Sequence, residues 1–499
     1  MRIALFREDR TYAKIAPMKI VILSSEATPF AKTGGLADVA GALPKFLSKL
    51  GLQVRLVMPL YREVRKKNLP LVRILDEQPS DWGNRRETFS VWQGSGDSSF
   101  AFFIEKDDWY DRDFLYGTPA GDYPDNGKRF SFYSTAALET LRALDFAPDI
   151  IHAHDWQSAM ALAVLKFPRQ ETSFFKNSRS LFTIHNLAYQ GLFEKSILAE
   201  TGLPDSLFTL DGVEFFDKVN FLKAGILYAT AVNTVSPKYS REIQTPEFGH
   251  GLDGLLRKRK DVLFGILNGV DYSAWDPGQD PFLKARYNPS ALDGKADCKN
   301  DLLETFGLPR SRRDAPIIGM VSRLAGQKGL DILVEALVGL FRLGATLVIL
   351  GTGEEKIQAA LISARDRYPS FFGLNIAFDD RIAHKIMAGC DMLLIPSRYE
   401  PCGLTQMYGL KYGTIPIVRA TGGLDDSIRE FQVSRGVGNG FKFEDYSARA
   451  LLDAVRRAIK VYDDKPSWDR LIQNAMAEDF SWDRSAREYI ALYQKIAGH

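Results

Sequence analysis

Short β-branched runs alternate with helical patterns along this chain, and the alternation begins twice. The strand-like runs of the first half are Lys19–Glu26, Gln53–Met58, Ser99–Ile104, Ile150–Ala153 and Ser180–Ile184. The second half has strand-like runs at Pro316–Val321, Ala345–Leu350, Asn375–Ala377, Asp391–Ile395 and Ile415–Val418, with helical patterns at Gly329–Leu343, Glu354–Arg367, Asp380–Gly389 and Pro401–Tyr412. Buried strands separated by helices predict parallel sheets covered by helices. The expected fold class is therefore α/β, with two doubly wound, Rossmann-like parallel sheets.

The chain of 499 residues is too long for a single hydrophobic core and predicts two large domains. Apolar residues make up 45% and charged residues 25% of it, as in an ordinary globular protein. The second alternation follows a strand and turn, so we expect the domain boundary near Phe264–Gly269. Residues 1–17 precede the run that opens at a second methionine, Met18, and are expected to be an N-terminal extension, with translation from Met18 as the alternative.

Charge and cysteine content argue against several classes of function. The 64 basic and 62 acidic residues leave a net charge of +2, without the basic tail or arginine-aromatic pattern of a nucleic-acid binder. Cys298, Cys390 and Cys402 form no C-x-x-C pair, so neither a disulfide framework nor a zinc site is indicated. We find no signal-peptide core and no apolar run of about 20 residues, and so expect a cytoplasmic protein without membrane association.

The stretch Ser397–Gly409 contains the first candidate site. The preceding run is strand-like, and Pro401 suits the first position of a helix, which predicts a strand-to-helix turn at Glu400. In a parallel sheet such a turn lies at the carboxyl ends of the strands, where ligands bind. The N–H groups of residues 402–404 would favour an anion there. The alternative is that Glu400 only caps the helix.

A second candidate is the segment Lys32-Thr-Gly34-Gly35-Leu-Ala-Asp38, between a predicted strand and a helix from about residue 37 to 50. Adjacent glycines let the backbone approach a ligand, and Lys32 brings a cation to the same place. The spacing matches neither the dinucleotide fingerprint nor a P-loop. A plain tight turn is the alternative.

Histidines also gather at predicted strand ends. His152 and His154 lie at the end of one strand and His185 at the end of the next, so metal ligation is a rival interpretation. No third ligand at helical spacing accompanies them, and we expect no metal. Asp111 and Asp113 could form the D-x-D that holds a divalent ion, but their polar, aromatic surroundings favour a surface loop.

Two cations follow the first predicted strand of the second half. Arg323 and Lys328 are five residues apart in a loop at the same predicted sheet edge as Glu400. Fixed cations there suit a diphosphate, although solvated surface cations are the commoner case. The nearby Gly351-Thr-Gly353 has two dinucleotide glycines, but Lys356 replaces the third, so a simple turn is expected.

Together these blocks resemble the bacterial and plant glycogen/starch synthases, the retaining transferases of glycosyltransferase family 5. The matching blocks are Lys32–Asp38, His154–Trp156, Thr183–Asn186, Ser322–Gly329 and Ser397–Gln406, in the family's order. The resemblance implies a GT-B fold, in which two Rossmann-like domains face a deep cleft. It implies an acceptor-side domain at 18–265, a donor domain at 266–481 and a C-terminal helix at 482–499 that crosses back to the first domain.

The resemblance also implies transfer of glucose from ADP-glucose to the non-reducing end of an α-1,4-glucan (glycogen), with retention of configuration and no cofactor. Arg323 and Lys328 would hold the leaving diphosphate, Glu400 the glucose hydroxyls, and His185 would face the sugar. The remaining residues expected to bind substrate are Lys32, Gly34, Gly35, Asp38, Asp155, Trp156, Asn186, Phe378, Cys402, Gly403, Leu404 and Thr405.

Two positions depart from patterns found in related transferases. Tyr408 stands where related retaining transferases often carry a second glutamate, and Phe378 replaces a tyrosine beside the adenine, which keeps a stacking face and loses a hydroxyl. Two rival functions remain open: another retaining GT-B transferase, such as one that makes a disaccharide, and a catalytically silent glucan-binding protein. The cations at Lys32, Arg323 and Lys328 argue against a silent binder, which has no leaving group to stabilise.

Overall fold

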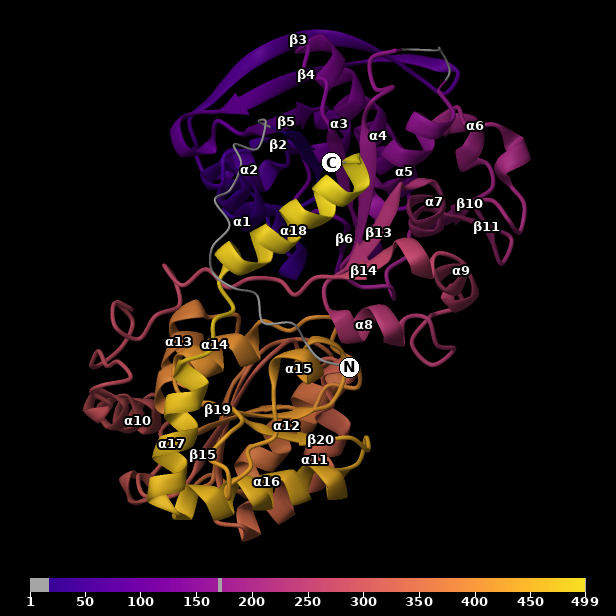
Figure 1. Ribbon diagram of the computed structural model, residues 1–499. Coiled ribbons are helices and arrows are strands. Elements are labelled where there is room, and N and C mark those ends of the chain that lie inside the picture. The colour runs from indigo at the N-terminus through magenta and orange to yellow at the C-terminus, as the bar shows by residue number, and fades with distance from the viewer. Residues whose placement is uncertain (1–17, 169–172, 499) are drawn as a thin grey trace. The chain divides into compact units, whose positions relative to one another are not determined.

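Two units, each built on a largely parallel sheet, make up the part of the chain that the computed structural model describes, residues 18–168 and 173–498 (Figure 1). The first unit contains the described residues of 1–183, 189–232 and 489–499, and the second contains 184–188 and 233–488. The extension expected at residues 1–17 lies outside the described residues. The α/β fold class predicted from the sequence is confirmed.

The sheet of the first unit has β1 at its centre. Its parallel strands are β1 (Lys19–Leu23), β2 (Gln53–Pro59), β5 (Ala101–Glu105), β8 (Ile150–His154) and β9 (Arg179–Ile184), in the order β5-β2-β1-β8-β9. Ile20 of β1 pairs with Val54 on one side and with Ile150 on the other. The strands β13 (Ala231–Thr234) and β14 (Leu263–Gly265) continue the order beyond β9. Because Ile20, Val21, Ile22 and Leu23 are fully buried, the β-branched run is a central strand, as predicted.

A long antiparallel hairpin extends this sheet beyond β5, and the sequence analysis did not predict it. It consists of β3 (Leu71–Trp82) and β4 (Arg85–Gly94), with Trp82 opposite Arg85. Short strands lie outside the main sheet at β6 (Gly117–Thr118), β7 (Gly121–Asp122), β10 (Leu192–Glu194), β11 (Glu214–Phe215) and β12 (Lys218–Asn220). Most residues of β3 are exposed or half-buried, and both strands carry charged side chains, so the hairpin lacks the continuous apolar run by which buried parallel strands are recognised.

Among the described residues, four helices that lie wholly in the first unit have eight residues or more. They are α1 (Gly35–Lys49), α4 (Asn126–Ala143), α5 (Asp155–Lys166) and α7 (Phe221–Tyr228), with the shorter α2 (Arg62–Lys66), α3 (Asp107–Tyr110) and α6 (Ile197–Thr201). The end of the last helix, α18 (Trp482–Ala497), belongs to this unit as well. Its buried Tyr493 hydroxyl lies 2.8 Å from Nδ1 of His152 at the end of β8.

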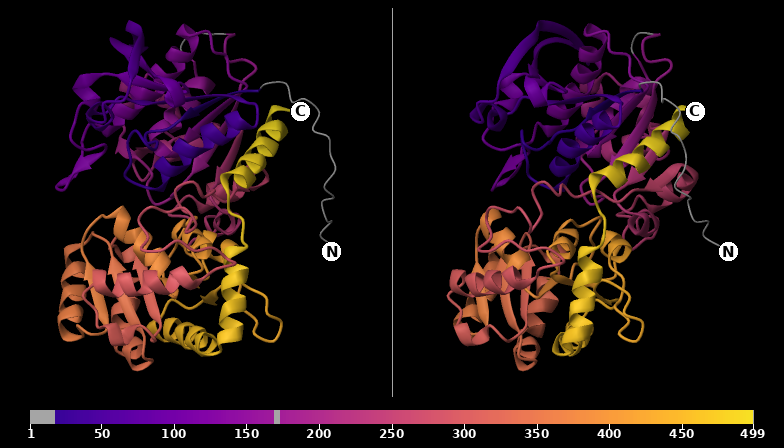
Figure 2. Two further views of the ribbon diagram at one scale, coloured as in Figure 1. Left: turned by 90° about the vertical axis from the view of Figure 1, so that its left-hand side faces the viewer. Right: turned by 60° about the vertical axis from the view of Figure 1, so that its left-hand side comes forward.

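The second unit has a six-stranded parallel sheet. Its order is β17-β16-β15-β18-β19-β20, with β15 (Ile317–Val321), β16 (Thr346–Leu350), β17 (Phe372–Asn375), β18 (Met392–Ile395), β19 (Ile415–Arg419) and β20 (Phe441–Phe443). Its helices are α8 (Pro237–Glu242), α9 (Asp253–Lys258), α10 (Asp293–Thr305), α11 (Leu330–Arg342), α12 (Glu355–Arg367), α13 (Asp380–Gly389), α14 (Thr405–Lys411), α15 (Gly422–Ser427), α16 (Ala448–Asp463) and α17 (Lys465–Met476). Helices lie on both faces of this sheet, as the views in Figure 2 show.

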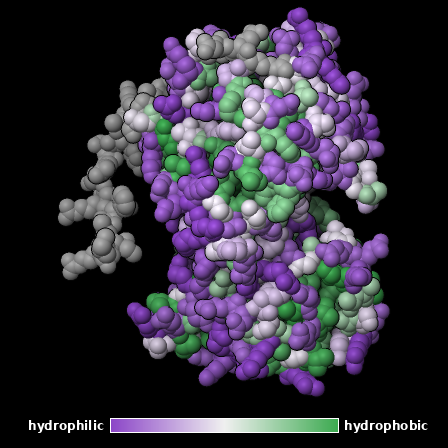
Figure 3. Space-filling model, turned by 90° about the vertical axis from the view of Figure 1, so that its right-hand side faces the viewer, coloured by the Kyte–Doolittle hydropathy of each residue, from purple (hydrophilic) through white to green (hydrophobic). Residues whose placement is uncertain are grey.

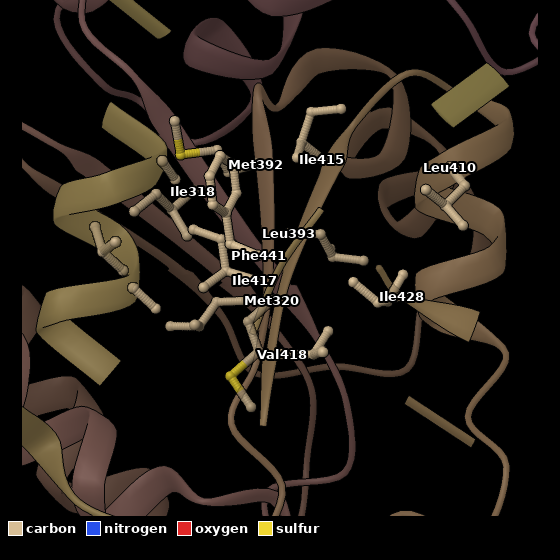
Figure 4. Close-up of a cluster of buried hydrophobic side chains, with 14 of the residues drawn as sticks. Ile318, Met320, Met392, Leu393, Leu410, Ile415, Ile417, Val418, Ile428 and Phe441 are labelled. Atoms are coloured by element: carbon tan, nitrogen blue, oxygen red, sulfur yellow. The ribbon is translucent and has the colours of Figure 1, made fainter. Parts of the chain in front are cut away.

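Apolar side chains fill the space between this sheet and its helices. Ile318, Met320, Leu393, Ile417 and Phe441 belong to one buried cluster (Figure 4). A second cluster includes Ile317 and Val348. Because adjacent residues of β15 contribute to different clusters, both faces of the strand are buried, as expected for a helix-covered parallel sheet.

The strand order places a topological switch point in each sheet. In the second unit the chain moves from β15 outward through β16 and β17, then returns to start β18 on the other side of β15. The first unit repeats this pattern, with its switch between β1 and β8. Connections leave in opposite directions there, and open α/β sheets bind ligands at the carboxyl ends of the two strands at such a point.

The surface is mostly hydrophilic on the face shown in Figure 3, with apolar residues between the polar ones. Among the described residues, no helix is both long enough and apolar enough to span a lipid bilayer.

Candidate active site

The site of the second unit is formed by the two loops at its switch point. One loop follows β15 and carries Arg323 and Lys328, and the other follows β18 and carries Glu400. They border a pocket whose polar lining includes Ser322, Lys328, Ser397, Glu400 and Thr405, together with Gly403. Four residues predicted separately from the sequence, Lys328, Glu400, Gly403 and Thr405, therefore share one pocket.

An ion pair lies at the centre of this pocket. Lys328 Nζ donates to Glu400 Oε2 at 2.6 Å, and their side chains are only 17% and 10% exposed. Ser397 Oγ donates to the same carboxylate oxygen at 2.8 Å. A largely buried charge is stable only when it is paired and hydrogen-bonded, and each of these two groups supplies the other's partner. The carboxylate and the cation therefore present polar, oriented groups to anything that enters the pocket.

Glycine lets the two loops approach each other. Gly329 has a positive φ of 72°, and a Cβ at this position would lie 2.0 Å from the carbonyl oxygen of Pro396. Gln327 connects the same loops, since its side-chain amide donates to Tyr399 O at 3.2 Å and its carbonyl accepts from Arg398 N at 2.8 Å. The sequence analysis assigned no role to Gln327, whose only signal was its position beside Lys328.

The turn after β18 corrects one prediction. The helix expected from Pro401 begins instead at Thr405, so residues 402–404 form an irregular turn. Gly403 has a φ of +70°, a left-handed conformation that a right-handed helix cannot include, and Gly423 N donates to Glu400 O at 3.1 Å. The Cys402 thiol within this turn is buried, which raises its pKa to about 12, so it is no nucleophile at neutral pH.

Two predicted donor-binding residues lie outside the pocket. Arg323 is exposed, and its Nη2 lies 3.5 Å from Gln327 Oε1. Phe378 is 81% exposed and lies between β17 and α13. An exposed aromatic face of this kind is suited to stack on a flat ring such as a nucleotide base. The strand predicted at Asn375–Ala377 is wrong in position, because β17 ends at Asn375 and residues 376–379 form the following loop.

The glycine loop of the first unit is held by a residue that the sequence analysis missed. Glu26 accepts from the backbone N–H groups of Thr33 and Gly34, the latter at 3.1 Å, and from Thr33 Oγ1 at 2.6 Å. The Tyr116 hydroxyl donates to Glu26 at 2.7 Å. The signal that could have identified Glu26 was an acidic residue three positions after a buried strand, where an unpaired carboxylate would be costly.

Beyond this anchor, the glycine loop is open. Lys32 Nζ pairs with Asp38 Oδ1 at 2.8 Å, both partly exposed. Cβ atoms built on Gly34 or Gly35 would have no neighbour within 4 Å. The backbone of these two glycines is therefore not covered by other side chains, and ligand binding there stays a prediction.

Asp155 and Trp156 follow β8, on the other side of this unit's switch point. Asp155 is buried and starts α5 with a φ of +54°, a left-handed conformation that is uncommon for a residue with a side chain. The Trp156 ring packs edge-on against Phe130, with centroids 5.1 Å apart, and against Phe193 at 5.6 Å. Trp156 is therefore also part of the aromatic core of the first unit.

His185 and Asn186 follow β9 and belong to the second unit by their contacts. Burial lowers the pKa of His185 to about 3, so its ring is neutral at physiological pH. Asn186 Oδ1 accepts from Ala188 N at 3.1 Å, and the Tyr239 hydroxyl accepts from Leu187 N at 3.1 Å, which fixes this turn.

The alternative metal ligands have other partners. Arg62 donates to Asp111 and to Asp113, each at 2.8 Å, so the D-x-D carboxylates form a surface ion-pair cluster with it. His152 bonds with Tyr493 and with Thr183 Oγ1 at 2.5 Å. Within 18–168 and 173–498, no three His, Cys, Asp or Glu side chains are grouped so that they could hold a metal ion.

Comparisons with known proteins agree with this geometry. The profile of the starch synthase catalytic domain matches residues 19–258, and that of glycosyl transferases group 1 matches residues 306–477. The glycogen synthase of Koribacter versatilis is 46% identical over 478 residues, 96% of this chain and 98% of that protein. The glycogen synthase of Thermosipho melanesiensis is 43% identical over 481 residues, 96% of this chain and 99% of that protein.

Solved structures give the same result. The catalytic domain of starch synthase IV from Arabidopsis thaliana, bound to ADP and acarbose, superposes with a TM-score of 0.89 at 33% identity, covering 97% of this chain and 100% of that one. Sucrose-phosphate synthase from Thermosynechococcus elongatus shares the fold, with a TM-score of 0.56 at 17% identity over 96% of this chain and 99% of that one. The family profiles, the full-length relatives and the fold agree, and the chain belongs to the glycogen and starch synthases, enzymes of the GT-B glycosyltransferase fold.

Proposed function

We propose that this glycogen synthase transfers glucose from ADP-glucose to the 4-hydroxyl at the non-reducing end of an α-1,4-glucan, with retention of the anomeric configuration. The observation that carries the proposal is the Lys328–Glu400 pair at the switch point of the second sheet. A cation and a carboxylate side by side suit a ligand with an anionic part and a hydroxyl-rich part, and a sugar nucleotide has both.

The charges match the reaction. Cleavage of the bond between the anomeric carbon and the diphosphate oxygen moves an electron pair onto the diphosphate and leaves positive charge on the sugar. Arg323 and Lys328 stabilise the departing diphosphate, whereas Glu400 accepts hydrogen bonds from glucose hydroxyls. Preorganised groups aimed at charge that develops in the transition state are the strongest source of such catalysis.

The other predicted residues complete the proposal. The base stacks on Phe378, and the backbone of residues 402–405 approaches the sugar and phosphates. The glycine loop with Lys32 approaches the phosphates, and its pair with Asp38 fixes that cation. The neutral His185 ring and Asn186 form hydrogen bonds with the sugar. Asp155 and Trp156 contact the glucose and the glucan acceptor.

No metal or cofactor enters this mechanism, since the fixed cations neutralise the diphosphate. The glucan acceptor supplies the nucleophilic hydroxyl, and its proton passes to an oxygen of the departing diphosphate as the new glycosidic bond forms. We place the enzyme in the cytoplasm, a location supported by the three cysteines, which are all buried free thiols.

The test compares ¹⁴C-labelled ADP-glucose and UDP-glucose as donors with a glycogen primer. We expect incorporation from ADP-glucose, release of the label by an α-1,4-specific hydrolase, and products longer than the primer. Glu400→Ala is the inactive control. A labelled disaccharide instead of an extended chain would favour the rival transferase, and binding of glucan without incorporation would favour the silent binder.

A further inference from the structure

Two short helices of the second unit cap each other with acidic side chains. Glu242, the last residue of α8, accepts from Gly422 N at 3.0 Å and from Thr421 Oγ1 at 3.3 Å, at the start of α15. Asp426 of α15 accepts in turn from Ser236 Oγ at 2.8 Å and from Lys238 N at 2.6 Å, at the start of α8. Each carboxylate satisfies N–H groups that a helix leaves without an internal partner.

The Glu242 end of this arrangement touches the turn that carries Glu400. Gly423 N donates to Glu400 O at 3.1 Å, and Gly422 N, one peptide earlier, donates to Glu242. A Cβ on Gly422 would lie 1.9 Å from Glu400 O, and one on Gly423 would lie 2.0 Å from Cys402 O. Because the two backbones are in direct contact, a shift of Thr421–Gly423 also shifts the turn that carries Glu400.

Burial makes the Glu242 contact costly to lose. Glu242 is 8% exposed and Thr421 is 1% exposed, so water cannot replace the carboxylate without rearrangement. Asp426 lies at the other end of α15, and none of its hydrogen bonds reaches the Glu400 turn. The two acids thus hold the same pair of helices, but only Glu242 is one peptide away from the catalytic turn.

We propose that Glu242 is a positioning residue for glucosyl transfer. Through Thr421 and Gly422 it fixes the Gly423 N–H that holds the carbonyl of Glu400, and thereby sets the place of the Glu400 carboxylate. This inference rests on the proposed function. Small displacements of a catalytic group reduce the rate of the chemical step more than they weaken binding.

The test measures kcat and KM for Glu242→Ala, Glu242→Gln and Asp426→Asn in the full-length enzyme, with melting temperatures for each. We expect Glu242→Ala to lower kcat about tenfold or more with KM for the glucan within about twofold. Glu242→Gln keeps an oxygen acceptor and should restore most of kcat. Asp426→Asn should lower the melting temperature and leave kcat within about twofold. Glu247→Ala, an exposed acid five residues away in sequence, is the surface control.

Equal kcat losses in Glu242→Ala and Asp426→Asn would overturn the proposal. The loss would then result from weaker packing of α8 against α15 and not from a shift of the Glu400 turn. If Glu242→Ala does not fold, Thr421→Val and Thr421→Ser make the same comparison, with the serine variant expected to restore kcat. Amide hydrogen exchange of residues 398–406 provides a readout that needs no activity, and we expect faster exchange in Glu242→Ala only. A wild-type enzyme without glucosyl transfer would refute the proposed function, whereas unchanged exchange would refute the positioning role.

Discussion

Replacing Glu400 by glutamine should tighten ADP binding while it removes transfer. In the structure Lys328 is paired with Glu400 at 2.6 Å, so a diphosphate that binds Lys328 must lie close to a carboxylate of the same sign. Two unit charges about 6 Å apart repel by about 3 kcal/mol at an effective dielectric constant of about 20. Water in the open pocket reduces this to about 1–2 kcal/mol, and 1.4 kcal/mol corresponds to about tenfold in Kd.

The assay is calorimetric titration of ADP into wild type, Glu400→Gln and Lys328→Met. We expect Kd to fall about tenfold in Glu400→Gln and to rise in Lys328→Met, because the first removes repulsion and the second removes the attracting cation. Glu355→Gln, an exposed acid at the start of α12, is the matched control and should bind ADP as wild type does. The same Glu400→Gln protein should show almost no transfer from ADP-glucose.

An unchanged or weaker affinity of Glu400→Gln for ADP would refute the reasoning. It would mean that the diphosphate does not reach Lys328, or that Glu400 stabilises the pocket more than it repels the ligand. A double variant separates these cases. If Lys328→Met abolishes the gain that Glu400→Gln gives, the two residues act on the same phosphate.

Three further outcomes are expected. Arg323→Ala and Lys328→Ala should each lower kcat by about 10²-fold or more, with a smaller change in KM, and a variant changed only in KM would contradict their role toward the leaving group. EDTA should leave transfer largely intact, whereas loss of activity with recovery on Mn²⁺ would implicate Asp111 and Asp113. Burial raises the pKa of Glu139 from its ordinary value of 4.5 to about 7, so the folded state retains a proton that the unfolded state loses, and stability falls as pH rises toward and through 7. Glu139→Gln should therefore stabilise the protein by on the order of 1 kcal/mol at pH 8 and by little at pH 5, as measured by urea unfolding.

The sequence predicted the parts of the fold that depend on local pattern. The continuous apolar run before Glu26 became the central strand β1, and the helix expected at Gly329–Leu343 is α11 at Leu330–Arg342. The helix expected from Pro401 failed because proline tolerates both a helix start and an extended turn, and the choice depended on Gly403 and on Gly423, which is remote in sequence. The antiparallel hairpin was missed because its partly exposed strands contain polar residues and therefore no continuous apolar run.

The site was predicted in a similar way. Residues that meet at a sheet edge because of strand order, such as Lys328 and Glu400, could be inferred from their positions after strands. Their direct pairing could not, since side-chain contacts between loops about 70 residues apart depend on the packed structure. Glu26 holds the glycine loop and Glu242 accepts from the start of α15, and neither stands in a motif. The position of Glu26 after a buried strand was its one sequence signal, whereas only the hydrogen bonds of the structure identify Glu242.

The carboxylate of Glu26 has a consequence for the thermodynamics of donor binding. Ordering a backbone residue costs about 1–2 kcal/mol of conformational entropy, and a glycine loses more freedom than any other residue. If a ligand had to order a loop such as Lys32–Gly35, this loss of entropy would weaken every binding event. Since Glu26 already holds the N–H groups of Thr33 and Gly34, this loop is ordered during folding, and a ligand that bound there would not lose affinity by ordering it.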